Sequence, residues 1–102
     1  MIVVRLDIVE RYFAHGTGGG MKSARKAFDA WRVIAVNARW RTPIDIKRSH
    51  PKVSVLRRGR VVFNIKGNDF RLVVQINYAA ETAEIRFFGS HAEYDEIDAQ
   101  TV

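Results

Sequence analysis

The sequence predicts an α+β fold, in which N-terminal helices pack on a small antiparallel sheet and a short helix follows at the C-terminal end. Apolar residues recur every three or four positions over residues 21–40 and every second position over residues 60–88. A helix-capping pattern then opens the stretch 90–98. The chain has 102 residues, of which 47% are hydrophobic, so we expect one domain with a single core over residues 1–102.

The N-terminal part predicts a strand, a helix and a break. Residues 1–6 are rich in β-branched side chains, and residues 7–15 have helical spacing. The glycines of "GTGGG" (16–20) interrupt the pattern. Met21, where a phosphate-binding loop requires glycine, precedes Lys22, so we interpret the stretch as a flexible loop between two helices.

A long helix is predicted over residues 21–40, followed by a short one. The buried stripe of the long helix is expected to hold Ala24, Phe28, Trp31, Ala35 and Ala38. In the sequence "TPID", Thr42 suits an N-cap, Pro43 suits the first helical position, and Asp45 follows three residues after the cap. This short helix is expected to end before Pro51.

An antiparallel meander is predicted from three strands over residues 60–66, 70–78 and 82–88, with a weaker strand over 53–56 before them. "GN" at 67–68 fits a two-residue hairpin turn. One face, which the helices cover, is expected to carry Val61, Phe63, Ile65, Phe70, Leu72, Val74, Ile76, Ala83, Ile85 and Phe87. The second face is expected to be open and polar, and to carry Arg60, Asn64, Lys66, Arg71, Gln75, Asn77 and Arg86.

The chain has a formal net charge of +6, which is unevenly distributed. Residues 22–60 hold twelve Lys and Arg against two Asp, a formal charge of +10, whereas residues 91–102 hold four acidic residues and no Lys or Arg. A basic body favours a polyanion such as nucleic acid as partner, although a solubilising surface explains the same charge. The sequence has no cysteine, and no apolar run approaches the roughly 18 residues that a membrane helix needs. We therefore expect a cytoplasmic protein.

The second face concentrates positive charge. Its cations Arg60, Lys66, Arg71 and Arg86 meet a single carboxylate, Glu84. Long cations side by side repel each other, so the arrangement makes sense if an anion lies between them. Arginine suits phosphate in particular, because its planar fork donates two parallel hydrogen bonds.

The stretch "IRFFGSHAEYDEID" (85–98) reads as a strand that runs into a helix. Ser90 and Glu93 fit a capping box, which explains both residues without any function. His91 and Tyr94 are then unexplained, and their spacing places them on one side of the helix. Two interpretations of His91 stay open: a residue that only starts the helix, or an acid or base that transfers a proton.

Together with "WRTPIDIK" (40–47) and "RVVFNIKGNDFRLVVQINY" (60–78), this stretch resembles the HigB-type toxins of bacterial toxin–antitoxin pairs, within the wider RelE-like group. The likeness covers about residues 40–98. It implies a RelE-like fold and an endoribonuclease activity, an mRNA interferase that cleaves messenger RNA on the ribosome and inhibits translation.

The resemblance also implies which residues form the site. Arg71 matches the sheet arginine of the "YRLVY"-like motif, and Lys66 lies in the preceding strand, where these toxins place basic residues. His91 and Tyr94 match the "GTHxEYD"-like motif, with Ser90 in place of the commoner threonine. The N-terminal glycine run departs from the family pattern, which concerns the interhelical loop and not the site.

The implied reaction uses no metal or other cofactor. The RNA 2′-hydroxyl attacks the adjacent phosphate, which leaves a 2′,3′-cyclic phosphate and a 5′-hydroxyl. We predict that His91 is the acid or base, that Tyr94 orients it or stacks on a base, and that Lys66 and Arg71 stabilise the charged phosphorane. The RNA and phosphate contacts are assigned to Arg60, Asn64, Asn68, Gln75 and Arg86.

The implied partners are a HigA-like helix-turn-helix antitoxin, messenger RNA on the ribosome, and ribosomal RNA bound by the basic segment 22–60. Operator DNA is reached only through the antitoxin, and no membrane partner is expected. We expect the antitoxin to present acidic residues to the basic surface. Two other functions stay open: a non-catalytic RNA-binding module, and a related toxin that poisons DNA gyrase.

Overall fold

The computed structural model describes residues 1–16 and 18–102 and has the predicted α+β architecture. The elements in chain order are β1 (Ile2–Val4), α1 (Leu6–His15), α2 (Met21–Asn37), α3 (Pro43–Ser49), β2 (Ser54–Val55), β3 (Arg60–Ile65), β4 (Phe70–Asn77), β5 (Thr82–Ser90) and α4 (His91–Tyr94). The break predicted over 16–20 separates α1 from α2, and its Thr17 lies outside the described residues. Within the described residues, no helix is both long enough and apolar enough to cross a membrane.

In the part of the chain that the structure describes, five strands form one sheet in the order β1-β5-β4-β3-β2. The strands predicted over 60–66, 70–78 and 82–88 correspond to β3, β4 and β5 and form the expected antiparallel meander. The prediction of a purely antiparallel sheet is wrong, because β1 pairs with β5 in parallel, with Ile2 opposite Thr82. Strand alternation within one segment carries no information about the direction of a neighbour that is distant in sequence.

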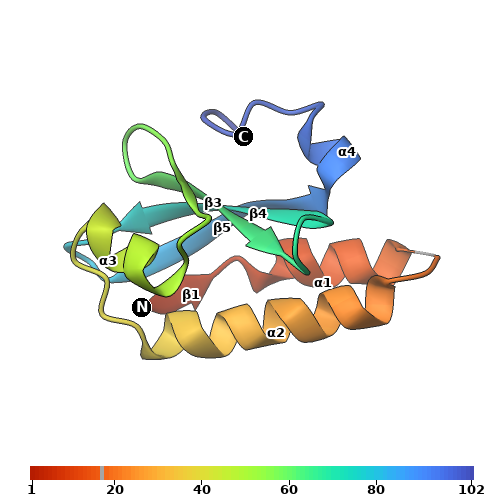
Figure 1. Ribbon diagram of the computed structural model, residues 1–102, viewed down its shortest axis with the longest axis horizontal. Coiled ribbons are helices and arrows are strands. Elements are labelled where there is room, and N and C mark those ends of the chain that lie inside the picture. Colours follow the sequence, from red (N-terminus) through yellow and green to blue (C-terminus); the bar gives the residue numbers. More distant parts are fainter. Residues whose placement is uncertain (17) are drawn as a thin grey trace.

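Helices α1 and α2 lie along one face of the sheet (Figure 1). The stripe predicted for the long helix is confirmed at Ala24, Phe28, Trp31 and Ala35, which are buried, whereas Ala38 lies beyond the helix and is only partly buried. The ring of Trp31 meets Phe63 of β3 at a centroid distance of 5.3 Å, which joins helix and sheet in one core. Helix α2 ends at Asn37 rather than at residue 40, because the backbone of Ala38 is extended.

Helix α3 begins as predicted. Thr42 is the N-cap, Pro43 is the first helical residue, and the Asp45 carboxylate accepts the main-chain N–H groups of Arg41 and Thr42 at 2.9 and 3.1 Å. The hydrogen bond from Arg41 is the main reason that the pKa of Asp45 lies below its usual value. The helix ends at Ser49, as the nearby proline requires.

The turn between β3 and β4 partly follows the prediction. Gly67 has a φ of 62°, and the N–H of Asp69 donates to the carbonyl of Lys66 at 3.1 Å. However, Lys66 itself has a left-handed backbone with a φ of 55°, so pairing stops at Ile65 opposite Phe70. The strand predicted to reach residue 66 is therefore one residue shorter.

A β-bulge changes the faces at the end of β5. Val73 of β4 pairs with Phe87, whereas the next residue of β4 pairs with Ile85, so Arg86 is the extra residue. Beyond the bulge, Phe88 packs in the main core with 3% of its surface exposed, and Phe87 packs on the second face. The prediction that Phe87 faces the helices is wrong, because strict alternation has no place for an inserted residue.

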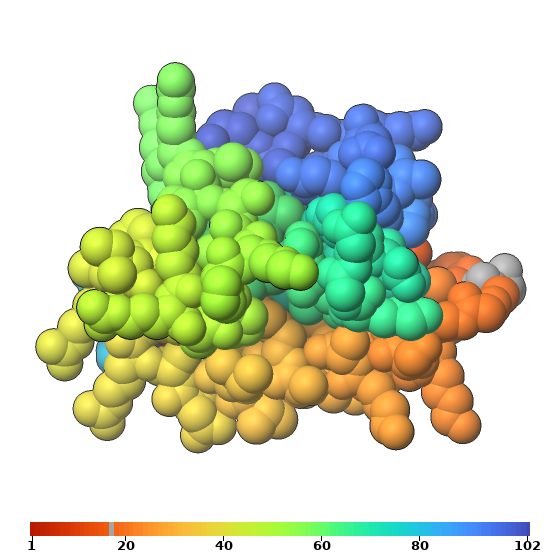
Figure 2. All heavy atoms as spheres, viewed as in Figure 1, coloured from red at the N-terminus to blue at the C-terminus, as the bar shows by residue number. Residues whose placement is uncertain are grey.

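The second face of the sheet is covered, which corrects the prediction of an open polar face. The residues after α4 run back across the strands, on the side opposite α2 (Figure 2). A small apolar cluster, which we name the second apolar cluster, forms there from Leu56, Val62, Val73, Phe87, Tyr94, Ile97, Ala99 and Val102. Arg71 and Arg86 do share this face, as predicted, since each contacts a member of that cluster.

Candidate functional site

The residues predicted for the site do not form a single group. The group that we name the Arg71 cluster lies where β4 begins and β5 ends, and comprises Asn68, Arg71, His91, Tyr94 and Asp95. A second group, Arg60, Gln75 and Arg86, lies under the C-terminal residues. Lys66 and Asn64 lie outside both groups.

Arg71 is held by the β3–β4 turn and by α4. Its Nη1 donates to the carbonyl of Asn68 at 2.9 Å, and its Nη2 donates to the Oδ1 of the same residue at 2.7 Å. The guanidinium carbon lies 5.9 Å from the centre of the Tyr94 ring, a cation–π contact. Within the described residues, these contacts leave the Nε–H of Arg71 without a partner, so the cation is fixed in position and still able to bind an anion.

Gly89 of β5 stands directly opposite Arg71 in the sheet. A Cβ at this position would come within 2.7 Å of the Phe87 ring and 3.3 Å of the Glu93 Cβ. A side chain at this position would therefore displace the Phe87 ring, which packs closely over Gly89. Because the strand continues through Gly89 to Ser90, α4 begins directly beside Arg71.

His91 forms a pair with Asp95. The main-chain N–H of His91 donates to the carbonyl of Asp69 at 2.9 Å, which anchors α4 to the β3–β4 turn. The Nδ1 of the ring lies 3.1 Å from Oδ2 of Asp95. An ionised carboxylate only accepts hydrogen bonds, so Nδ1 carries the hydrogen and Nε2 is the nitrogen left for proton transfer.

Asp95 is the site residue that sequence reasoning missed. In the sequence pattern it is one of the four acidic residues over 91–102. The signal that identifies it is its distance of four residues from His91, which places the two side chains on the same side of a helical turn.

Ser90 and Glu93 form the predicted capping box. The Oγ of Ser90 accepts the N–H of Glu93 at 3.2 Å, and Oε1 of Glu93 accepts the N–H of Ser90 at 2.8 Å. The hydroxyl of Tyr12 in α1 donates to the same carboxylate oxygen at 2.7 Å, which ties α4 to the helical layer. The Ser90 hydrogen bond lowers the pKa of Glu93, and burial raises the pKa of Tyr12 to about 12.

Lys66 points away from the Arg71 cluster. Its Nζ lies beside Gly20 at the start of α2, where a Cβ would come within 2.7 Å of it, and 3.7 Å from Oδ2 of Asp69. The prediction that Lys66 shares the second face with Arg71 is therefore wrong. The physical cause is its left-handed backbone, which turns the side chain off the alternation of β3.

Arg60 and Arg86 hold the C-terminal residues against the sheet. Arg60 is 8% exposed; its Nη1 donates to the carbonyls of Ala99 at 3.2 Å and Val102 at 2.5 Å, and its Nε donates to Oε1 of Gln75 at 3.0 Å. Arg86 donates to the carbonyl of Val102 at 3.1 Å. Burial, and then repulsion from Arg86, lower the pKa of Arg60. Protein oxygens thus accept hydrogen bonds from several donors of Arg60 and Arg86. The RNA contacts assigned to these residues stay a prediction.

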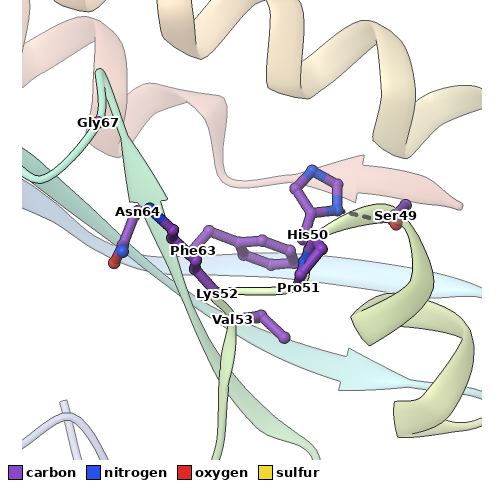
Figure 3. A pocket seen from close by; sticks show the side chains of 8 residues that line it. All are labelled: Ser49, His50, Pro51, Lys52, Val53, Phe63, Asn64 and Gly67. Carbon is purple, nitrogen blue, oxygen red and sulfur yellow. Dashed lines mark hydrogen bonds between the residues drawn. The ribbon is translucent and has the colours of Figure 1, made fainter.

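A pocket of about 350 Å³ opens beside the site, between the segment after α3 and β3 (Figure 3). It is lined by Ser49, His50, Pro51, Lys52, Val53, Phe63, Asn64 and Gly67. Asn64 is the one residue of this lining that the sequence analysis assigned to the site. The pocket adjoins the Arg71 cluster, because Asn64 pairs with Arg71 across β3 and β4.

Comparison of the sequence with known families gives a match. Residues 24–97 match the model of the RelE-like toxic component of a toxin–antitoxin system, a match that includes α3, β2 to β5 and α4. The family is HigB toxin, and the chain belongs to it. Its natural partner is therefore an antitoxin. No curated protein matches the chain.

Proposed function

We propose that this toxin is an endoribonuclease that cleaves messenger RNA on the ribosome and thereby inhibits translation in the cytoplasm. The observation that carries the proposal is the Arg71 cluster: a fixed guanidinium on β4 faces Gly89, and two residues further along the chain is a histidine whose Nδ1 is held by Asp95. A fixed cation can stabilise the charged phosphorane, and an oriented imidazole can transfer a proton, and both effects promote transesterification of RNA.

The reaction forms a bond between the 2′-oxygen and phosphorus and breaks the bond between phosphorus and the 5′-oxygen. One proton leaves the 2′-hydroxyl, and one proton is taken up by the departing 5′-oxygen. Nε2 of His91 accepts the first proton or supplies the second, and the other proton is exchanged with water; Asp95 stabilises the imidazolium form. Arg71 donates hydrogen bonds to the phosphorane, whose negative charge is greatest in the transition state.

Tyr94 has two contributions in this proposal. Its ring holds the Arg71 guanidinium from one side. The part of the ring that the second apolar cluster leaves exposed offers a stacking surface for an unpaired base. Lys66 takes no part in this arrangement of the site, because its ammonium lies on the helical side.

The basic segment 22–60 supplies the attraction to ribosomal RNA. Its formal charge of +10 is only partly neutralised within the protein; for example, Arg25 pairs with Glu10 at 2.6 Å and Asp29 at 3.4 Å. Binding to the ribosome should therefore weaken steeply as salt is raised. The same charge supports a HigA-like antitoxin with an acidic contact surface.

The test is cleavage of a labelled message on purified ribosomes, with the chemistry of the cut ends determined. The buffer is treated with chelator and then contains only the magnesium that the ribosome needs. We expect cleavage under these conditions, and we expect the products to carry 5′-hydroxyl and 2′,3′-cyclic phosphate ends. Folded protein that binds ribosomes and leaves the message intact would support the non-catalytic RNA-binding function instead. Inhibition of DNA supercoiling with intact messages would identify a gyrase poison.

A further inference from the structure

The pocket beside β3 exists because β2 is short. The strand predicted over 53–56 is present only as two residues, which pair with Val61 and Val62. From Phe63 onward, the described residues place no further strand against this edge of β3. The segment 49–53 instead bends away and leaves the space of about 350 Å³ (Figure 3). This volume lies within the range of pockets that bind small ligands.

His50 forms one wall, and its orientation and tautomer are fixed. Its ring packs edge-to-face on Trp40 and Phe63, with centroid distances of 5.9 and 5.0 Å. The hydroxyl of Ser49 donates to the carbonyl of Ile46 at 3.1 Å, so its oxygen accepts from Nδ1 of His50 at 2.8 Å. Nε2 is then a hydrogen-bond acceptor. Burial lowers the pKa of His50, which favours this neutral form.

Asn64 lies at the rim between the pocket and the Arg71 cluster. In Figure 3 its amide points away from the Phe63 ring, toward the second face of the sheet. Arg71 is its cross-strand partner on that face, so their Cβ atoms are about 5 Å apart. Gly67, on the same rim, precedes Asn68, whose oxygens hold Arg71. A nucleotide chain bound at Arg71 can therefore place its neighbouring base in the pocket.

The charge around the pocket favours a polyanion over an apolar peptide. Residues 47–60 carry six Lys and Arg and no acidic residue. Lys52, which is exposed, lies in the lining itself and offers an ammonium group to a phosphate at the mouth. Aromatic and apolar walls with a few convergent polar groups and a cation at the mouth are the features that bind an unpaired base together with its phosphate.

We propose that this pocket binds one unpaired nucleobase of the RNA strand that the toxin cuts, adjacent to the nucleotide held by Arg71. The base packs against His50 and Phe63, Nε2 of His50 accepts a hydrogen bond from it, and Lys52 contacts its phosphate. The pocket then sets the sequence preference of the toxin. This inference rests on the proposed function, but binding in the pocket is measurable without cleavage.

The first experiment is a titration of isotopically labelled protein with each of the four nucleoside 5′-monophosphates and with ribose 5-phosphate, followed by NMR. We expect chemical-shift changes at His50, Val53 and Phe63, strongest for one base and absent for the sugar phosphate. The variant His50→Phe keeps an aromatic ring but lacks the acceptor and should lose the preference among bases. His15→Ala, an exposed histidine on α1, is the matched control and should change nothing. Equal shifts with ribose 5-phosphate, or shifts confined to the Arg71 cluster, would overturn the proposal.

The second experiment is sequencing of the ends that wild type and His50→Phe produce from a mixed pool of ribosome-bound messages. A changed distribution of bases beside the cut supports the proposal, whereas Arg71→Ala should reduce cutting at every sequence alike. An unchanged distribution with weaker ribosome binding would mean that the base comes from ribosomal RNA, which contradicts the assignment to the cut strand. If wild type cuts nothing, the proposed function fails, and the titration still decides whether the pocket binds a base.

Discussion

The guanidinium of Arg71 lies over the ring of Tyr94, with 5.9 Å between its central carbon and the ring centre. The two residues come from elements that are distant in sequence, β4 and α4. Their contact fixes the single turn of α4 against the sheet and thereby sets the position of His91. The proposed proton transfer by His91 therefore depends on the contact between Arg71 and Tyr94.

Arg71→Ala should reduce cleavage of a ribosome-bound message by about 10²–10³-fold, because one fixed donor to the transition state is lost. Arg71→Lys should recover only part of this, since an ammonium lacks the planar fork. Arg11→Ala, which removes an exposed arginine of α1, is the matched control. Thermal melts should show that all three variants fold, and full activity of folded Arg71→Ala would remove the basis of the proposed site.

His91→Ala should reduce the cleavage rate by about 10²–10⁴-fold if the imidazole transfers a proton. His91→Gln should not restore it, because an amide keeps a polar group and cannot carry the proton. Asp95→Asn should also slow cleavage, because the imidazole loses the carboxylate that accepts from its Nδ1 at 3.1 Å. An unchanged cleavage rate of folded Asp95→Asn would make Asp95 a helix-end residue only.

Phe88→Ala should destabilise the fold by about 3–5 kcal/mol, the usual cost of emptying an aromatic site in a core. The Phe88 ring packs with those of Tyr12, Phe13, Phe28 and Phe70. Phe87→Ala should cost less, because that ring is only half-buried in the smaller cluster. Urea unfolding curves measure both values. A larger loss of stability in Phe87→Ala than in Phe88→Ala would contradict the bulge and would support simple alternation along β5.

Arg60→Met should lower the free energy of unfolding by roughly 1–3 kcal/mol, because the carbonyls of Ala99 and Val102 lose a charged donor. The last residues should also become accessible to protease in the folded protein. Arg39→Met, at an exposed position, is the control. Unchanged protease resistance of the C-terminal residues in Arg60→Met would show that apolar packing alone holds them.

Acid should destabilise the protein partly through Glu93. Its pKa in the folded protein lies below the ordinary value of 4.5, chiefly because the Ser90 N–H donates to it. The carboxylate therefore contributes stability above about pH 4.5, which is lost as the pH falls through the folded pKa. Glu93→Gln should make the melting temperature less sensitive to pH between 3 and 5 than wild type. Parallel curves for the two proteins would exclude this contribution.

The sequence predicted those features whose causes are local. The buried stripe of α2 and the caps at Thr42 and Ser90 depend on residues within a few positions of one another, so spacing was sufficient. The left-handed backbone of Lys66 was not predictable, because nothing in its neighbours requires it. The burial of Arg60 depends on residues about 40 positions away, which a pattern cannot connect.

The bulge at Arg86 has a consequence for the whole site. The two halves of β5 are out of phase: core positions follow each other at a spacing of two up to Ile85, and the next one, Phe88, comes after three. If Arg86 instead paired with Val73 in regular alternation, every residue after it would change to the other face of the sheet. His91 would then emerge on the side of the helices, opposite Arg71. A single unpaired residue thus determines on which side of the sheet the histidine and the arginine meet.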